Sequence, residues 1–221
     1  MFNNIVNNLF MQEISNNTEK QILVAAEKEF VERGVAGART TSIASSAGVT
    51  HAMLHYYFRT KEQLFEKVVD EKMDVLVQSV MDSFSSVREN LSFVERISCI
   101  IRVHYCFLAD NERLPLFLLN EILSNPTRKE MLVSKARNKV LPVAVQLETQ
   151  MRDAVVKGEI CSIDLLTLVV DIISLNIISI IAKPHILPLS GLDDERYHNW
   201  RCEENVRTIL LRLNPTVSND E

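Results

Sequence analysis

The sequence predicts an all-α protein, and three observations support this. Glycine and proline are scarce, with 5 and 6 residues among 221, so the chain has few of the turn signals that separate short strands. Apolar residues recur every three or four positions along most of the chain, which is the period of one helix face. Hydrophobic residues make up 47% of the chain, enough to bury a core without disulfides or metals.

The N-terminal part predicts three helices. Residues 19–33 carry apolar side chains at i, i+4 and i+8, and the helix is expected to end at Gly34. A short helix at 43–47 should end at Gly48, because glycine readily adopts the left-handed conformation of a tight turn. A third helix is expected from His51 to about Phe58.

Longer helices are expected in the rest of the chain. An apolar stripe from Phe65 to Phe84 indicates a connecting helix, and a loop is expected at Pro184–Gly191. The other expected helices are 93–108, 116–123, 125–158, 162–182 and 193–213. The expected organisation is a flexible tail (1–17), an N-terminal domain (18–65), a C-terminal helical domain (66–213) and a second tail (214–221).

The composition indicates a cytoplasmic protein that is not inserted in a membrane. The first residues lack the basic and long apolar regions of a signal peptide. The apolar segment Leu165–Ala182 is interrupted by Asp171 and Asn176, and an unpaired Asp in a bilayer centre is costly. We therefore expect this segment to be buried in protein. The four cysteines form no CxxC pair, which is typical of small buried residues in a reducing compartment.

Charge is distributed unevenly along the chain. The net charge is −5, but residues 18–61 contain six Lys or Arg against four Glu. This segment therefore carries +2 and the remainder −7. An anionic partner is expected to contact the N-terminal part.

Two short helices joined by a glycine turn are the elements of a helix-turn-helix, whose second helix lies in the major groove of DNA. Ala44 and Ala47 are small enough for close helix crossing, and Val49 and Leu54 are apolar. Polar or small side chains remain on the outer surface, where they can contact phosphates or base edges: Thr50, His51, Ala52, Met53 and His55.

At this point the chain resembles the tetracycline-repressor (TetR) family of bacterial regulators. The matching residues are AxxxFxxxGV at Ala26–Val35 and IAxxAGVTxxxLxYYFxTKExLF at Ile43–Phe65. Beyond them only the layout is similar, including a KGEI turn at Lys157–Ile160. One departure is His55, which stands where most relatives have Tyr.

The resemblance implies a regulator of transcription that binds a palindromic operator on double-stranded DNA as a homodimer, most simply a repressor. It implies dimerisation through the last two helices and an unidentified small-molecule effector that weakens DNA binding. It implies no cofactor. The DNA-contacting residues implied by position are Thr40, Thr41, Thr50, His51, Ala52, Met53, His55, Tyr56 and Lys61. Tyr57 offers a further hydroxyl to a phosphate, and Arg39, where many relatives carry Thr, is expected to add a phosphate contact.

Candidate residues of the effector pocket are His104, Tyr105, Phe107, Met151 and Asn176. For His104 and Met151 the alternative is an ordinary core position, and Asn176 could instead fix the register of a dimer. We expect no metal site, although His51 and His55 share a helix face, because no third ligand is evident.

Two other functions remain as alternatives. One is a helical adaptor that binds proteins and has lost DNA binding. The other is an enzyme in the C-terminal helices, for which no set of catalytic residues is evident.

Overall fold

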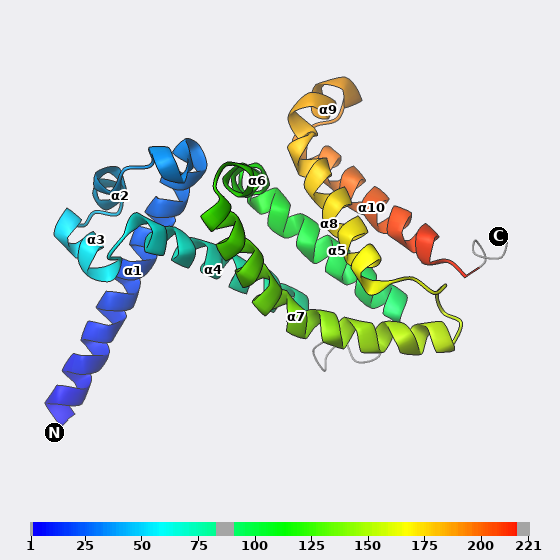
Figure 1. The fold of residues 1–221 in the computed structure, drawn as a ribbon, viewed down its shortest axis with the longest axis horizontal. Coiled ribbons are helices and arrows are strands. Elements are labelled where there is room, and N and C mark those ends of the chain that lie inside the picture. The colour runs from blue at the N-terminus through cyan, green and yellow to red at the C-terminus, as the bar shows by residue number, and fades with distance from the viewer. Residues whose placement is uncertain (1, 83–90, 216–221) are drawn as a thin grey trace. The chain divides into compact units, whose positions relative to one another are not determined.

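The computed structural model describes residues 2–82 and 91–215, with side chains from residue 17 onward. Ten helices and no strand occur within these residues, as the sequence predicts (Figure 1). The chain forms two compact units. The N-terminal unit comprises Met1–Lys72 and Leu123–Asn125, and the C-terminal unit comprises Met73–Ile122 and Pro126–Glu221.

The N-terminal unit contains α1 (Phe2–Gly37), α2 (Thr40–Ser46), α3 (His51–Tyr57) and the first half of α4 (Lys61–Met81). Residues 2–17, which we expected to be a tail, continue α1. Gly34 breaks the helical conformation of α1 with φ 68° and ψ 162°, at the position where the sequence predicts its end.

The core of this unit is built from the apolar faces of its helices. Ile22, Phe30 and Phe65 are fully buried. The rings of Phe30 and Phe65 meet edge to face, with centroids 5.8 Å apart, an arrangement that adds to their hydrophobic contact. Helix α2 adds buried Ile43 and Ala44, and α3 adds buried Leu54. Two short helices are therefore fixed on a larger core.

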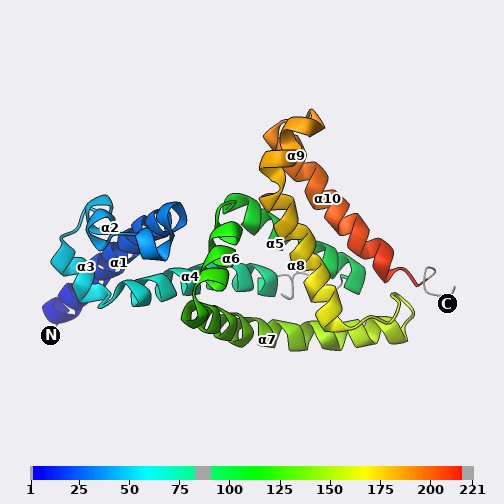
Figure 2. The same ribbon diagram turned by 45° about the horizontal axis from the view of Figure 1, so that its top comes forward.

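The C-terminal unit contains the second half of α4 and six further helices (Figure 2). These are α5 (Phe93–Asp110), α6 (Leu114–Ser124), α7 (Pro126–Val156), α8 (Leu165–Ile181), α9 (Lys183–Ser190) and α10 (Asp194–Leu213). The prediction of a loop at Pro184–Gly191 is wrong, because most of this segment forms α9. Two prolines, Pro184 and Pro188, are tolerated in this eight-residue helix, the first of them in its opening turn.

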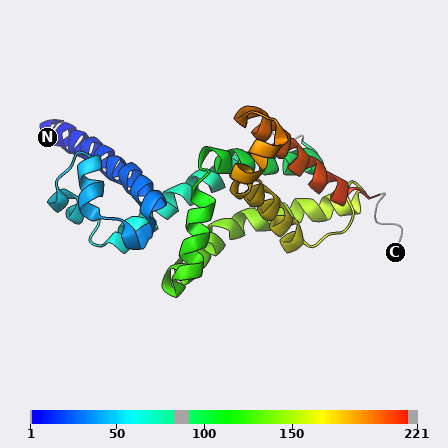
Figure 3. The same cartoon turned by 90° about the horizontal axis from the view of Figure 1, so that it is seen from above.

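Helices α5, α8 and α10 pack against one another, and α8 lies beside α10 when viewed from above (Figure 3). Ile101, Leu168 and Ile209, one from each helix, are fully buried between them. Helix α7 ends at Val156, two residues before Gly158, where the sequence predicts its end and where φ is 71°.

Helix α8 was expected to be buried in protein, and one of its faces is. Among the described residues no single helix is both long and apolar enough to cross a membrane. Helices α8 and α9 together have sufficient length and apolar character, but they are bent by 68° at their junction.

Candidate nucleic-acid interface and ligand cavity

The turn between α2 and α3 follows directly from the sequence around Gly48. Gly48 has φ 68°. The N–H of Val49 donates to the carbonyl of Ala44 (3.0 Å), and the N–H of Gly48 donates to that of Ser45 (3.1 Å). This pair of bonds is the Schellman motif, which satisfies the last carbonyls of a helix. It redirects the chain into α3.

Thr50 begins α3. Its side-chain oxygen accepts a hydrogen bond from the N–H of Met53 at 3.2 Å, the usual role of an N-cap residue. Leu54 is 1% exposed and anchors the helix to the core, whereas Met53 and Tyr56 are 41% and 79% exposed. Because one residue holds α3 in place, the rest of its surface is free for a partner.

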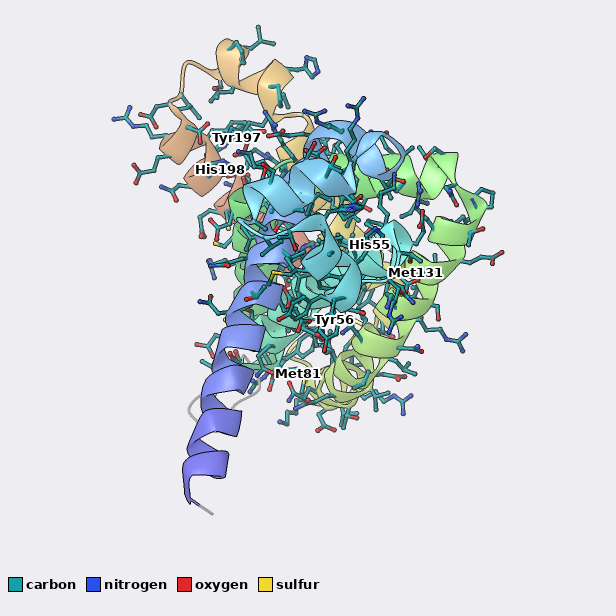
Figure 4. The ribbon with its side chains drawn as sticks, turned by 90° about the vertical axis from the view of Figure 1, so that its left-hand side faces the viewer. His55, Tyr56, Met81, Met131, Tyr197 and His198 are labelled. Carbon is teal, nitrogen blue, oxygen red and sulfur yellow. The ribbon has the colours of Figure 1, made fainter. Side chains whose placement is uncertain are left out.

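The predicted DNA-contacting residues converge on this surface, but several also bond to one another. The side-chain oxygen of Thr40 lies 2.9 Å from Nε2 of His51, which links the start of α2 to the start of α3. The rings of His51 and His55 meet edge to face, with centroids 4.5 Å apart. Nδ1 of His55 lies 3.3 Å from the carbonyl oxygen of Arg59. Figure 4 labels His55 and Tyr56 on α3.

The remaining predicted DNA contacts differ in exposure. Arg39 and Thr41 are exposed around the start of α2, and Ala52 is exposed on α3. Tyr57 is half-buried and its ring stands edge to face with that of Tyr56.

Lys61 has an internal role that the sequence did not reveal. Its ammonium donates to the carbonyl oxygens of Ala36 and Ala38, both at 3.2 Å. These bonds attach the start of α4 to the last turn of α1 and to the segment that follows it. Two of the three ammonium protons are therefore committed to the fold.

A cavity of about 150 Å³ lies in the C-terminal unit. Its walls come from α4, α5, α7 and α8. His104 is the one polar side chain among the described residues that line it. The others are Leu76, Val77, Val80, Ile100, Val140, Val143, Ala144, Leu147, Val169, Ile172 and Ile173.

The five residues expected in an effector pocket do not lie together. His104 lines the cavity, and buried Asn176 is one hydrogen bond behind it at 3.0 Å. Met151 belongs to the apolar core. Tyr105 and Phe107 belong to another cluster, where the hydroxyl of Tyr105 bonds to Nδ1 of His198 at 3.1 Å. The sequence did not single out the aliphatic residues of the cavity, because they follow the same periodicity as ordinary core residues.

Titratable groups also gather where α9 and α10 meet α5 (Figure 4, Tyr197 and His198). Glu112, Asp194 and His198 place one potential metal ligand each within 4.8 Å of one another. The ammonium of Lys183 bonds to both carboxylates. Burial lowers the pKa of Lys183, but these bonds outweigh it and raise the pKa above its usual value. The ammonium of Lys183 therefore already supplies the positive charge that a metal ion would bring to these carboxylates.

Comparison with known proteins identifies the family of the helix-turn-helix. The model of the family described as bacterial regulatory proteins, tetR family, matches residues 22–68, the segment that includes α2, α3 and the turn at Gly48. The helix-turn-helix segment of this chain is therefore similar to that of the TetR family.

Curated relatives are TetR-family transcription regulators. The activator FasR of Mycolicibacterium smegmatis is 28% identical over 107 residues, covering 48% of each chain. The fatty acid metabolism regulator of Bacillus subtilis is 26% identical over 96 residues, 43% of this chain and 48% of that protein. These matches span about half the length of the two relatives. Both relatives are named as regulators, which agrees with the function predicted from the sequence.

Solved TetR-family structures extend the likeness in fold to the C-terminal unit. The fatty acid degradation regulator FadR of Bacillus halodurans has a TM-score of 0.68 at 19% identity, covering 89% of this chain and 97% of that chain. FadR of Bacillus subtilis in complex with stearoyl-CoA has a TM-score of 0.63 at 20% identity, covering 85% and 97%. The predicted fold class is confirmed.

Proposed function

We propose that this protein is a ligand-responsive transcriptional repressor that binds a palindromic operator as a homodimer. The observation that carries this proposal is the outer surface of α3. It follows a glycine turn, is anchored by Leu54, and leaves Ala52, Met53 and Tyr56 exposed. A short helix of this kind can enter the major groove and read base edges with its first turns.

In this proposal, residues 50–53 of α3 contact base edges, whereas Arg39, Thr41, Tyr56 and Tyr57 contact phosphates. Thr40 and His51 approach the DNA as a hydrogen-bonded pair. His55 contacts a base or a phosphate. Lys61 contributes its positive charge next to the start of α4, although its main work is to hold the fold together. Phosphate contacts position the protein, and base contacts select the sequence.

The proposed dimer forms through α8 and α10. Helix α8 exposes Leu166, Val170 and Ile178 at 70%, 51% and 55%. Helix α10 exposes Leu211 at 55%. A row of exposed aliphatic residues is typical of an interaction surface. A two-fold dimer would place two copies of α3 one DNA turn apart, about 34–36 Å.

The proposed effector is a largely apolar molecule bound in the cavity around His104, and a fatty acyl compound is the first candidate. The aliphatic wall supports this, as do relatives named for fatty acid regulation. The effector would bind more tightly to a dimer whose two α3 helices no longer match the operator spacing, and so it would weaken DNA binding.

The test is the recovery of an operator from a pool of genomic fragments by gel shift and sequencing at two salt concentrations. Arg39→Ala should weaken binding and reduce the slope of log affinity against log salt by about one. Arg152→Ala is the matched control, because it removes one positive charge from an exposed site on α7 and should leave the slope unchanged. Recovery of no fragment would reject DNA binding and favour the alternative of a protein-binding adaptor.

A further inference from the structure

The cavity around His104 has a wall of unusual uniformity. Apart from the imidazole, every described side chain that lines it is aliphatic. None of these residues can neutralise a charge or form a hydrogen bond with a ligand through its side chain. Among these lining side chains, His104 is therefore the one that can form a hydrogen bond with a polar atom of a bound molecule, and a polar atom left unpaired in an apolar environment is costly.

A chain of hydrogen bonds behind His104 fixes which of its ring nitrogens carries the proton. The guanidinium of Arg201, which can only donate, bonds to Oδ1 of Asn205 at 2.7 Å. The amino group of Asn205 therefore faces Asn176 and donates to its Oδ1 at 2.9 Å. The direction of donation runs from α10 towards α8.

The orientation of Asn176 is fixed a second time by the main chain. Its amino group lies 3.0 Å from the carbonyl oxygen of Ile101, which can only accept. The same amino group lies 3.0 Å from Nδ1 of His104. Nδ1 is therefore the acceptor, and in the neutral ring the proton resides on Nε2.

Two further facts describe what His104 presents to a ligand. The one hydrogen bond that His104 forms with the described part of the chain uses Nδ1, which leaves Nε2 available to a ligand. Burial lowers the pKa of His104 to about 4, so the ring is neutral near pH 7. The cavity thus contains one neutral N–H donor in an aliphatic wall.

Resting on the effector cavity of the proposed function, we propose that the effector has a hydrocarbon body and one uncharged carbonyl oxygen that accepts a hydrogen bond from Nε2 of His104. Esters, thioesters and ketones belong to this class. A carboxylate would be desolvated with no cation among the described residues that line the cavity. An alcohol could accept from Nε2, but its own proton would remain without a partner in the aliphatic wall.

Four probes of similar shape test this chemistry: acetophenone, ethylbenzene, 1-phenylethanol and phenylacetate. Their benzene ring suits the cavity, because an engineered protein cavity of about 150 Å³ binds benzene. Each is titrated into the full-length protein labelled with ¹⁵N-histidine, and binding is measured by NMR. Acetophenone is expected to bind about 3- to 10-fold more tightly than ethylbenzene, the net effect of one hydrogen bond, and to shift the Nε2 resonance of His104.

Two variants separate the hydrogen bond from the cavity. His104→Phe keeps a ring but removes the donor, so it should bind acetophenone and ethylbenzene equally. His185→Phe makes the same change at an exposed residue of α9 and should retain the wild-type preference. The ¹⁵N shifts should also identify the proton on Nε2 in the free protein.

The inference is overturned if wild-type protein binds ethylbenzene as tightly as acetophenone, if phenylacetate binds most tightly, or if the proton resides on Nδ1. Failure of all four probes to bind would reject the effector cavity together with the inference. Neither result bears on operator recognition, because the gel-shift experiment measures DNA binding without a ligand.

Discussion

At the scale of single residues, polar side chains in this protein act mainly by fixing the orientation of their neighbours. Lys61 ties α4 to the segment after α1, and Thr40 holds the ring of His51. Asn176 holds the ring of His104. Because Nδ1 of His104 accepts that hydrogen bond, the proton of the neutral ring resides on Nε2. The functional atoms on both candidate sites are therefore positioned before a ligand arrives.

The depressed pKa of His104 makes the stability of the protein depend on pH. Well above pH 6.5, the ordinary pKa of histidine, the ring is neutral in both the folded and unfolded states, so it contributes no pH dependence. As the pH falls from 6.5 towards 4, the unfolded chain binds a proton that the folded protein excludes, because burial lowers the folded pKa to about 4. This group should therefore lower the free energy of unfolding by up to about 3 kcal/mol across that window.

Urea unfolding at a series of pH values measures this effect. His104→Phe should lose less stability than wild type between pH 6.5 and 4, and the two curves should run parallel above pH 7. His185→Phe, at an exposed site, should follow the wild-type curve. Parallel curves for wild type and His104→Phe throughout the acid range would contradict a buried neutral imidazole.

At the scale of elements, the turn between α2 and α3 depends on the left-handed conformation of Gly48. A Cβ at this position would contact no atom within 4 Å, so the cost of Gly48→Ala is conformational and not steric. The left-handed region costs a residue with a side chain about 1–2 kcal/mol. We expect the free energy of unfolding, measured with urea, to fall by that amount.

Gly37→Ala is the matched control for this prediction. Gly37 is the last residue of α1 and does not have a positive φ. An added Cβ would meet Cβ of Arg33 at 3.6 Å, an ordinary contact. Because alanine favours helix over glycine, this variant should be as stable as wild type or slightly more stable. An equal loss of unfolding free energy in both variants would contradict a specific requirement for the left-handed conformation at Gly48.

The elements differ in how far the sequence predicts them. Helices α2 and α3 follow from local signals, since Gly48 and Thr50 determine where one ends and the other begins. Helix α9 does not follow from local signals, because Pro184 and Pro188 are typical of loops. Its first residue, Lys183, is buried, and the local sequence does not indicate this burial. The cavity also escapes prediction, since an aliphatic residue such as Val143 has the same sequence pattern whether it lines a void or fills a core.

At the scale of the whole molecule, affinity for the operator should depend on α8, because α8 forms part of the proposed dimer interface. Dimerisation brings two α3 surfaces onto one operator, and loss of the dimer leaves each with a single half-site. Val170 is half-exposed on α8 (51%), within its row of exposed aliphatic residues. A glutamate here would bury a charge in an apolar interface. Val170→Glu is therefore expected to be monomeric.

Sedimentation analysis and gel shift test this prediction together. Val170→Glu should sediment at half the mass of wild type and lose most of its affinity for the palindromic operator, while retaining a cooperative unfolding transition. Val133→Glu introduces the same charge at a similarly exposed valine of α7 (55%) and should remain dimeric. If both variants stay dimeric, the interface lies elsewhere. If both dissociate, added charge alone breaks the dimer. Dissociation of Val170→Glu alone would assign the interface to α8, because the two substitutions differ only in place.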